Sequence, residues 1–273
     1  MCRWLAYLGT PIYLDELLFK PEHSLIRQSL RARHSTVTIN GDGFGVGWYG
    51  ERAEPGLYRD LQPAWNDANL RSLAEQIRTR LFFAHVRAST GTSVSRDNCH
   101  PFRHGRWMFM HNGQIGGFDR IARDLDFAIA PELYRARKGT TDSETLFYLM
   151  LTHGLDQDPA GAMGRTVALV QRTMAAAGIE APLRLTAALT DGQRIYALRH
   201  SSDNAAPTLF YGYSGDIARA GLLRMDHDDE KDSLMVLSEP LDDVDSHWSA
   251  VEEGSLVEVS GGKVRQTPFR VPA

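Results

Sequence analysis

The chain has little cysteine: among its 273 residues only Cys2 and Cys99 occur. Two cysteines are too few for a disulfide framework or for a zinc site with four cysteine ligands. Any cysteine chemistry is therefore expected to be that of a single thiol. Cys99 has no neighbour along the chain that would activate it as a second nucleophile, so we interpret Cys99 as structural.

Long apolar runs and an excess of basic charge are also missing. No stretch approaches the roughly 18 to 20 apolar residues that span a bilayer, and an Asp-Glu pair at residues 15–16 interrupts the segment where a signal peptide would stay apolar. The formal net charge is −4, which does not suit a nucleic-acid partner. These features predict a cytoplasmic protein with no membrane or nucleic-acid contact and a small polar substrate.

What the chain does have is enough apolar residues, 42% of the total, to bury a substantial core. No repeat or Pro/Ser-rich linker divides it, so we expect a single domain over residues 1–273. Short apolar runs next to Gly, Asn or Asp predict strands at residues 3–8, 44–49, 81–87 and 107–110. Two hairpins are expected later, at residues 183–198 and 255–266, with turns at Asp191-Gly192 and Gly261-Gly262.

Three helices are expected between these strands. Asp67 can cap a helix whose apolar residues recur at helical spacing up to Ile77, and Thr141 and Glu144 have the spacing of a capping box. A third helix is expected at residues 160–177. Strands at both ends of the chain, with helices grouped in the middle, favour an α+β layered sandwich over an alternating βαβ fold.

Cys2 is a candidate nucleophile because removal of Met1 would leave a residue with both a thiol and a free α-amine. An α-amine has a pKa of roughly 7.7–8.0, so it can accept the thiol proton near neutral pH. The simpler alternative is that Cys2 only begins a buried strand.

The run His111-Asn112-Gly113 follows the predicted strand at residues 107–110. Attack of a thiolate on an amide creates an oxyanion, which needs fixed donors such as the Asn112 side chain and the Gly113 N–H. The alternative is an ordinary hairpin turn, since Asn-Gly is a strong turn signal.

Further blocks decide between these alternatives. Together with Cys2, they resemble the class II glutamine amidotransferases of the N-terminal-nucleophile (Ntn) hydrolase superfamily. The resemblance is closer to a stand-alone subgroup that includes the YafJ-like proteins and the amidohydrolase of ergothioneine biosynthesis. It covers nearly the whole chain and is carried by residues 2–9, 40–49, 84–90, 98–102, 111–113, 140–144 and 238–241.

This resemblance implies a four-layer αββα sandwich and assigns the site residues. Cys2 would be the nucleophile, and Asn112 and Gly113 would form the oxyanion hole. Arg87 would bind the substrate α-carboxylate and Asp142 its α-ammonium, which fits the need of an amino-acid pocket for one fixed cation and one fixed anion.

Each binding residue also has a plainer interpretation. Arg87 could be a strand-end charge, and Asp142 could be a first-turn acid favoured by the helix dipole. His111, next to the oxyanion pair, is grouped with the substrate-binding residues.

The implied reaction hydrolyses the γ-amide of glutamine to glutamate and ammonia through a Cys2 thioester, without a cofactor. Better-studied domains carry Trp and Ala where this chain has Ala88 and Ser89. The smaller Ala88 leaves open an alternative, a γ-glutamyl substrate larger than glutamine. A catalytically silent glutamine-binding protein is a second alternative. The matched blocks leave no room for a synthase domain, so any ammonia acceptor would be a separate synthase.

Three other patterns receive structural interpretations. His85, His100, His104 and His111 lack the spacing of a metal site, so no metal is expected. The acidic run at residues 226–230 lacks the ligand pattern of a calcium loop and is interpreted as a solvated loop. The alternating glycines at residues 41–47 indicate close backbone packing near the active site, because no phosphate-loop ending follows them.

Overall fold

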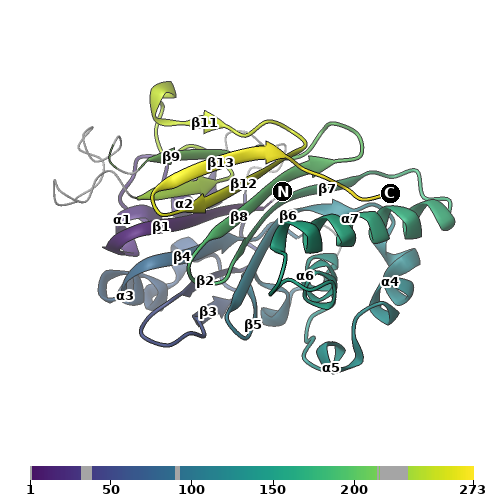
Figure 1. Ribbon diagram of the computed structural model, residues 1–273. Helices are drawn as coiled ribbons and strands as arrows, with labels where there is room; N and C mark the ends of the chain where they lie inside the picture. Colours follow the sequence, from purple (N-terminus) through teal and green to yellow (C-terminus); the bar gives the residue numbers. More distant parts are fainter. Residues whose placement is uncertain (1, 32–38, 90–92, 214, 216–232) are drawn as a thin grey trace.

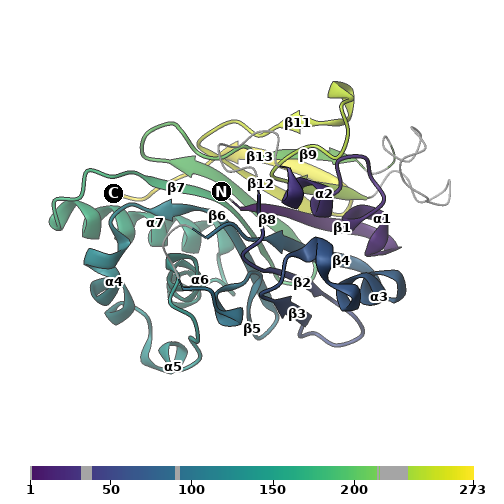
Figure 2. The ribbon, with the colours of Figure 1, turned by 180° about the vertical axis from the view of Figure 1, so that it is seen from behind.

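Two antiparallel sheets face each other in the computed structural model, which describes residues 2–31, 39–89, 93–213, 215 and 233–273. Figure 1 and the reverse view in Figure 2 show helices on the outer sides of the sheets. The N-terminal strand lies in the middle of one sheet, with three strands on either side.

The first sheet has seven strands in the order β11-β9-β10-β1-β4-β2-β3. Their bounds are Arg3–Tyr13 (β1), Phe44–Trp48 (β2), Gly56–Asp60 (β3), Arg78–Val86 (β4), Phe210–Tyr213 (β9), Leu234–Leu237 (β10) and Ser249–Ala250 (β11). Strand β1 pairs with β4 on one side and β10 on the other, which places Arg3 opposite Val86 and Leu5 opposite Leu237.

The second sheet has six strands in the order β13-β12-β8-β7-β6-β5. Their bounds are Phe102–His104 (β5), Trp107–Ile115 (β6), Leu183–Thr190 (β7), Ile195–Ser201 (β8), Ser255–Ser260 (β12) and Lys263–Pro268 (β13). Side chains alternate between the two faces of each strand. On β6, Met108 and Met110 therefore point toward the first sheet, whereas Phe109 points toward the helices.

Helices cover both outer faces. The first sheet carries α1 (Asp15–Leu18), α2 (Leu25–Leu30) and α3 (Ala68–Gln76), and the second carries α4 (Phe118–Phe127), α6 (Asp142–Thr152) and α7 (Pro159–Ala176), with α5 (Pro131–Tyr134) beside α6. Three short 3-10 helices lie at Ala64–Asn66, Arg96–Asn98 and Asp245–His247. The predicted four-layer αββα sandwich of the α+β class is confirmed.

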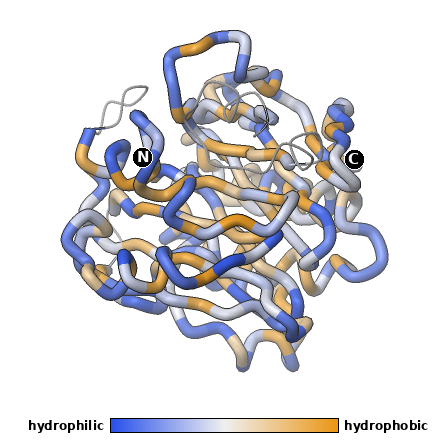
Figure 3. The backbone as a smooth tube through the Cα atoms, turned by 90° about the vertical axis from the view of Figure 1, so that its left-hand side faces the viewer, coloured by the Kyte–Doolittle hydropathy of each residue, from blue (hydrophilic) through white to orange (hydrophobic). Residues whose placement is uncertain are grey.

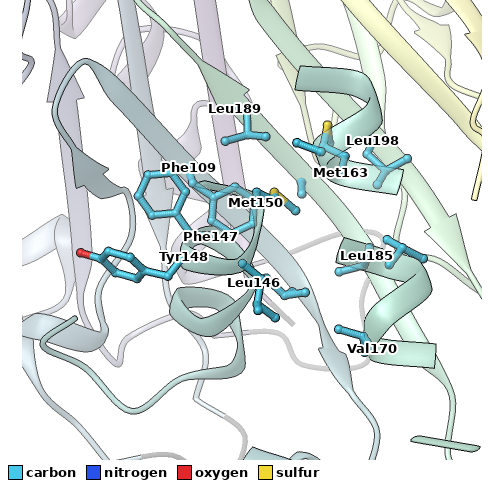
Figure 4. Packing of buried hydrophobic residues seen from close by; sticks show 14 of the residues in the cluster. Phe109, Leu146, Phe147, Tyr148, Met150, Met163, Val170, Leu185, Leu189 and Leu198 are labelled. Atoms are coloured by element: carbon cyan, nitrogen blue, oxygen red, sulfur yellow. The ribbon is translucent and has the colours of Figure 1, made fainter. Parts of the chain in front are cut away.

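Each interface between layers has its own apolar core. Trp4, Phe83 and Met110 are fully buried between the sheets. Figure 4 shows Phe109 and Leu185 of the second sheet packed against Phe147 and other residues of α6 and α7. In Figure 3 the outer loops are mostly hydrophilic, while hydrophobic residues recur along the strands. Burial of this apolar surface holds the layers in place and makes the sheets a rigid support for a site.

The sequence located most of these elements. The four predicted strands and both hairpins are confirmed, and Gly261 and Gly262 form a two-residue turn with φ of 53° and 68°. The side chain of Asp67 caps α3 as predicted, and that of Thr141 caps α6. Residues 226–230 lie outside the described residues.

Two expectations are wrong. Strand β6 does not end before His111 but continues to Ile115, because Asn112 and Gly113 pair with Thr186 and Leu185 of β7. The Asn-Gly turn alternative is thereby excluded. The helices are also not confined to the middle of the chain, since the short α1 and α2 follow β1 directly.

Candidate active site

At the start of β1, Cys2 lies against strand β6 of the second sheet. The main-chain nitrogen of Cys2 donates to Oδ1 of Asn112 at 3.1 Å, across 110 residues of sequence. A main-chain amide nitrogen can only donate, so the amide oxygen of Asn112, and not its NH2 group, faces the Cys2 nitrogen. After removal of Met1, this Cys2 nitrogen would be the α-amine.

The Asn112 amide has an unused donor. Nδ2 is buried and makes no hydrogen bond among the described residues, and the residue is only 2% exposed. An unpaired buried donor is costly in a folded protein and often marks a functional site. This orientation suits an oxyanion that forms beside Cys2.

The backbone at Gly113 excludes every other residue. Its φ is +149°, and a Cβ there would lie 1.9 Å from the carbonyl oxygen of Arg184 and 2.6 Å from Nε2 of His111. A side chain would push β6 away from β7. Glycine therefore lets the strand carry Asn112 past Cys2 without a break in the sheet.

The Cys2 thiol lies partly buried beside the end of β4. Its Sγ is 3.6 Å from the carbonyl oxygen of Ala88. Burial raises the pKa of this thiol, while the contact with Ala88 and the positive charges of Arg87 and Arg3 lower it. Burial is the largest of these effects, so the thiol is protonated at neutral pH and needs a base to become a nucleophile.

Arg87 lies directly after β4 and is 3% exposed. Its guanidinium contacts the carbonyl oxygen of Asp42 at 3.5 Å and that of Ser93 at 3.3 Å, as well as Oγ of Ser89 at 3.4 Å. These contacts are long for charged hydrogen bonds, which are usually about 2.7–2.9 Å. The guanidinium lies close enough to Cys2 for its charge to lower the pKa of the thiol.

Asp142 is the first residue of α6 and connects that helix to the end of β6. Oδ2 accepts from the main-chain N–H of Ile115 at 2.9 Å, and Oδ1 accepts from that of Ser143 at 2.7 Å. The helix dipole also favours a carboxylate at this position. Asp142 is therefore held beside Ile115, which lies three residues after Asn112 on β6.

The ring of His111 does not face Cys2. It lies on the helix side of β6, where it stacks on Phe109, and its Nδ1 is 2.8 Å from Oγ of Ser143. Nε2 lies 3.3 Å from the carbonyl oxygen of Arg184, which can only accept. Burial lowers the pKa of His111, although Asp142 opposes this effect. The neutral ring therefore donates from Nε2 to the Arg184 carbonyl and accepts a hydrogen bond from the Ser143 hydroxyl at Nδ1.

One positioning network was not found from the sequence. Glu144 accepts from the main-chain N–H groups of Lys138 and Gly139, at 3.0 and 2.6 Å, and so does not complete the capping box at Thr141. Asn98 accepts from Thr140 N at 2.9 Å. These bonds fix the loop before α6 and hence the position of Asp142. Asn98 and Glu144 both fall in the blocks that carry the family resemblance, which was the available signal.

Packing contacts are formed by Cys99 and by the other three histidines considered above as metal ligands, His85, His100 and His104. His85 and His100 are buried and stack with ring centroids 4.2 Å apart, and burial lowers the pKa of His85 to about 3 and that of His100 well below its usual value. His104 meets the edge of Tyr148. The Cys99 thiol is buried, which raises its pKa.

Glycines in β2 and just before it explain how these residues pack so closely. A Cβ at Gly45 would lie 2.2 Å from the carbonyl oxygen of His100, and one at Gly43 would lie 2.7 Å from Sγ of Cys99. The predicted close backbone packing is thus present.

Among the described residues, no group of three or more His, Cys, Asp or Glu side chains is placed to hold a metal ion. In the same part of the chain, no helix is long and apolar enough to cross a bilayer.

Comparison with known proteins identifies the family of this chain. The family model for class II glutamine amidotransferases matches residues 20–272, and the chain belongs to this family. The matched range begins after Cys2, so the match itself says nothing of the nucleophile.

Two curated relatives and a solved structure are similar over nearly the whole chain. The probable glutamine amidotransferase DUG3 of Saccharomyces cerevisiae is 38% identical, over 95% of this chain and 82% of the yeast protein. The γ-glutamyl-hercynylcysteine sulfoxide hydrolase of Mycolicibacterium smegmatis is 30% identical, over 98% of this chain and all of that protein. A glutamine amidotransferase class-II domain protein of Silicibacter pomeroyi is 39% identical, with a TM-score of 0.74 over 98% of this chain and all of that structure.

Proposed function

We propose that this protein is an N-terminal cysteine amidohydrolase that cleaves the γ-amide bond of glutamine or of a related γ-glutamyl compound, with Cys2 as the nucleophile. The contact between the Cys2 nitrogen and Oδ1 of Asn112 carries this proposal. It leaves the Asn112 NH2 group as a buried donor without a partner among the described residues, and it fixes the nitrogen that becomes the α-amine. We also propose that residues 1–273 form one amidotransferase domain.

The reaction would begin once Met1 has been removed. The neutral α-amine of Cys2 takes the thiol proton, and Sγ attacks the γ-carbonyl carbon. The oxygen becomes an anion that Nδ2 of Asn112 and the N–H of Gly113 stabilise. The carbonyl re-forms as the C–N bond breaks, and the protonated amine gives its proton to the leaving nitrogen. Water, deprotonated by the same amine, then hydrolyses the thioester to release glutamate.

Recognition of the glutamyl end would use opposite charges. Arg87 would pair with the α-carboxylate, and Asp142 would pair with the α-ammonium. Since the ring of His111 faces the helix side, we assign it the role of holding the side chain of Ser143, the neighbour of Asp142, and not of touching the substrate. A silent glutamine-binding protein would need Arg87 and Asp142 but neither the thiol nor the unused Asn112 donor.

A second candidate substrate is a γ-glutamyl compound with a larger leaving group. Ala88 is 7% exposed and lies against the Cys2 thiol, where its small side chain occupies little room. The mycolicibacterial relative is named for the hydrolysis of such a compound. With glutamine, ammonia leaves and a separate synthase could receive it, whereas with a larger γ-glutamyl amide an amine leaves.

A substrate survey tests the proposal. The protein would be incubated with glutamine, with γ-glutamyl dipeptides and with α-glutamyl dipeptides as matched controls, and glutamate release would be measured. We expect release from one or more γ-glutamyl compounds and none from the α-linked controls. Cys2→Ala should abolish it. Glutamate release that persists in Cys2→Ala would contradict the proposed nucleophile, and strict preference for glutamine would remove the larger substrate.

A further inference from the structure

The main chain of Cys2 is held on both sides. Asn112 accepts from its nitrogen, and the neighbouring Arg3 donates from NH1 to its carbonyl oxygen at 2.8 Å. Arg3 is only 1% exposed although it carries a full positive charge. A guanidinium so deeply buried requires a partner, because an unpaired charge in a protein interior is very costly.

The partner is Glu239, which is 2% exposed. Nε of Arg3 donates to Oε1 of Glu239 at 2.5 Å, and NH2 is in ion-pair contact with the same oxygen. Arg3 therefore spans from the carboxylate of Glu239 to the carbonyl of Cys2. Two elements separated by 236 residues along the chain meet at the nucleophile.

The backbone around Glu239 is itself joined to β1. The N–H of Ser238 donates to the carbonyl of Trp4 at 3.0 Å, and the N–H of Trp4 donates to Oγ of Ser238 at 3.1 Å. Nε2 of Gln28 donates to the carbonyl oxygen of Glu239 at 3.2 Å. Because these bonds fix the backbone, the carboxylate has a defined position from which to orient Arg3.

Stability alone does not account for such a pair. Replacement of a buried ion pair by apolar residues of similar size is often neutral or stabilising, because desolvation of the two charges offsets their attraction. The placement beside Cys2 offers another reason. The charge of Arg3 lowers the pKa of the Cys2 thiol against the larger effect of burial. The same charge would disfavour the protonated form of a nearby α-amine.

We propose that Arg3 and Glu239 form a positioning pair for the nucleophile, in which Glu239 orients Arg3 and Arg3 fixes the carbonyl of Cys2. Because Asn112 holds the nitrogen of Cys2, the thiol and the α-amine are then fixed in position relative to the donors that stabilise the oxyanion. The positive end of the pair lies nearer to Cys2 than the negative end. This inference rests on the proposed role of Cys2 as the nucleophile.

Two variants separate positioning from mere support of the fold. Glu239→Gln keeps the shape and leaves the Arg3 charge unbalanced, whereas Arg3→Met combined with Glu239→Met replaces the pair by apolar side chains of similar length. Arg199→Met is the control, because the Arg199 guanidinium also binds main-chain carbonyls, those of Ala206, Pro207 and Val251, but has no contact with Cys2. The full-length proteins would be compared by thermal denaturation and by kcat, KM and their pH dependence on the best γ-glutamyl substrate.

The expected shifts have opposite signs. In the double variant, kcat falls by about ten- to a hundredfold with KM nearly constant, because misplacement of a reacting group reduces the rate of the chemical step. The acidic limb of its kcat–pH profile moves to higher pH, because loss of the neighbouring cation raises the pKa of the α-amine. In Glu239→Gln the acidic limb moves to lower pH. Arg199→Met should keep the wild-type kcat and pH profile.

Folded variants with an unchanged kcat and an unchanged acidic limb would overturn the positioning role and leave Cys2 as the nucleophile. If Glu239→Gln does not fold, the double variant still decides, since it contains no unpaired buried charge. Labelling by 6-diazo-5-oxo-L-norleucine, a glutamine mimic, distinguishes failure of the proposed function from failure of the positioning role alone. Wild-type protein that is not labelled at Cys2 would overturn the proposed function and this inference together. Labelling of wild type and double variant at equal rates would overturn the inference alone.

Discussion

Replacement of Asn112 by Asp separates the two roles assigned to this side chain. The carboxylate has nearly the same shape, so one oxygen can still accept from the Cys2 nitrogen at the 3.1 Å contact seen for Oδ1. The Nδ2 donor, which has no other partner among the described residues, is lost. Loss of one oxyanion-hole donor typically lowers kcat by about 10²–10³-fold, or about 3–4 kcal/mol in the barrier. KM should change little, because Arg87 and Asp142 remain.

The new charge gives a second signature. A carboxylate next to the α-amine favours its protonated form, so the acidic limb of kcat should move to higher pH. Gln114→Glu is the matched control. It makes the same chemical change two residues further along β6, at an exposed side chain, and should keep kcat within about threefold because exposed charges are screened. Glutamate release over a pH series measures both effects. A folded Asn112→Asp protein with kcat within threefold of wild type at its own optimum would refute the oxyanion role.

Three further predictions concern stability and reactivity. Gly113→Ala should destabilise the fold by about 1–3 kcal/mol, or by more if β6 cannot move, because its Cβ meets the Arg184 carbonyl at 1.9 Å; thermal denaturation measures this. Ser143→Ala should raise KM with little effect on kcat, because it removes the hydroxyl that His111 holds next to Asp142, and an equal KM would contradict the support role. The pKa of His85 is about 3 in the folded state, so the unfolded state binds the proton first as pH falls. The contribution of this group to stability should be complete above about pH 6.5 and should fall by about 1.4 kcal/mol per pH unit from there down to about pH 3, and His85→Leu should flatten the slope in urea titrations.

The sequence predicted the parts of the fold that have local signals. The hairpin turn at Gly261-Gly262 and the helix caps at Asp67 and Thr141 each depend on a few adjacent residues, and all are present. The extension of β6 through Asn112 was not predicted, because Asn-Gly favours a turn and only pairing with β7 overrides that preference.

The same division holds at the site. The family resemblance selected Cys2, Asn112 and Gly113, and the structure places them together. The reach of Glu144 to the loop before α6, and of Arg3 to Glu239, could not be read from spacing. Such contacts join segments that only the completed fold brings together. These contacts hold Cys2, the proposed nucleophile, and Asp142 in place.

The most direct test of the central claim is an intact-mass measurement before and after treatment with 6-diazo-5-oxo-L-norleucine. We expect a mass without Met1, one adduct on the wild-type protein, and none on Cys2→Ala. That result would show both the N-terminal thiol nucleophile and recognition of a glutamine-like compound. Retention of Met1 in a protein that is fully active, or an adduct that persists in Cys2→Ala, would contradict the account.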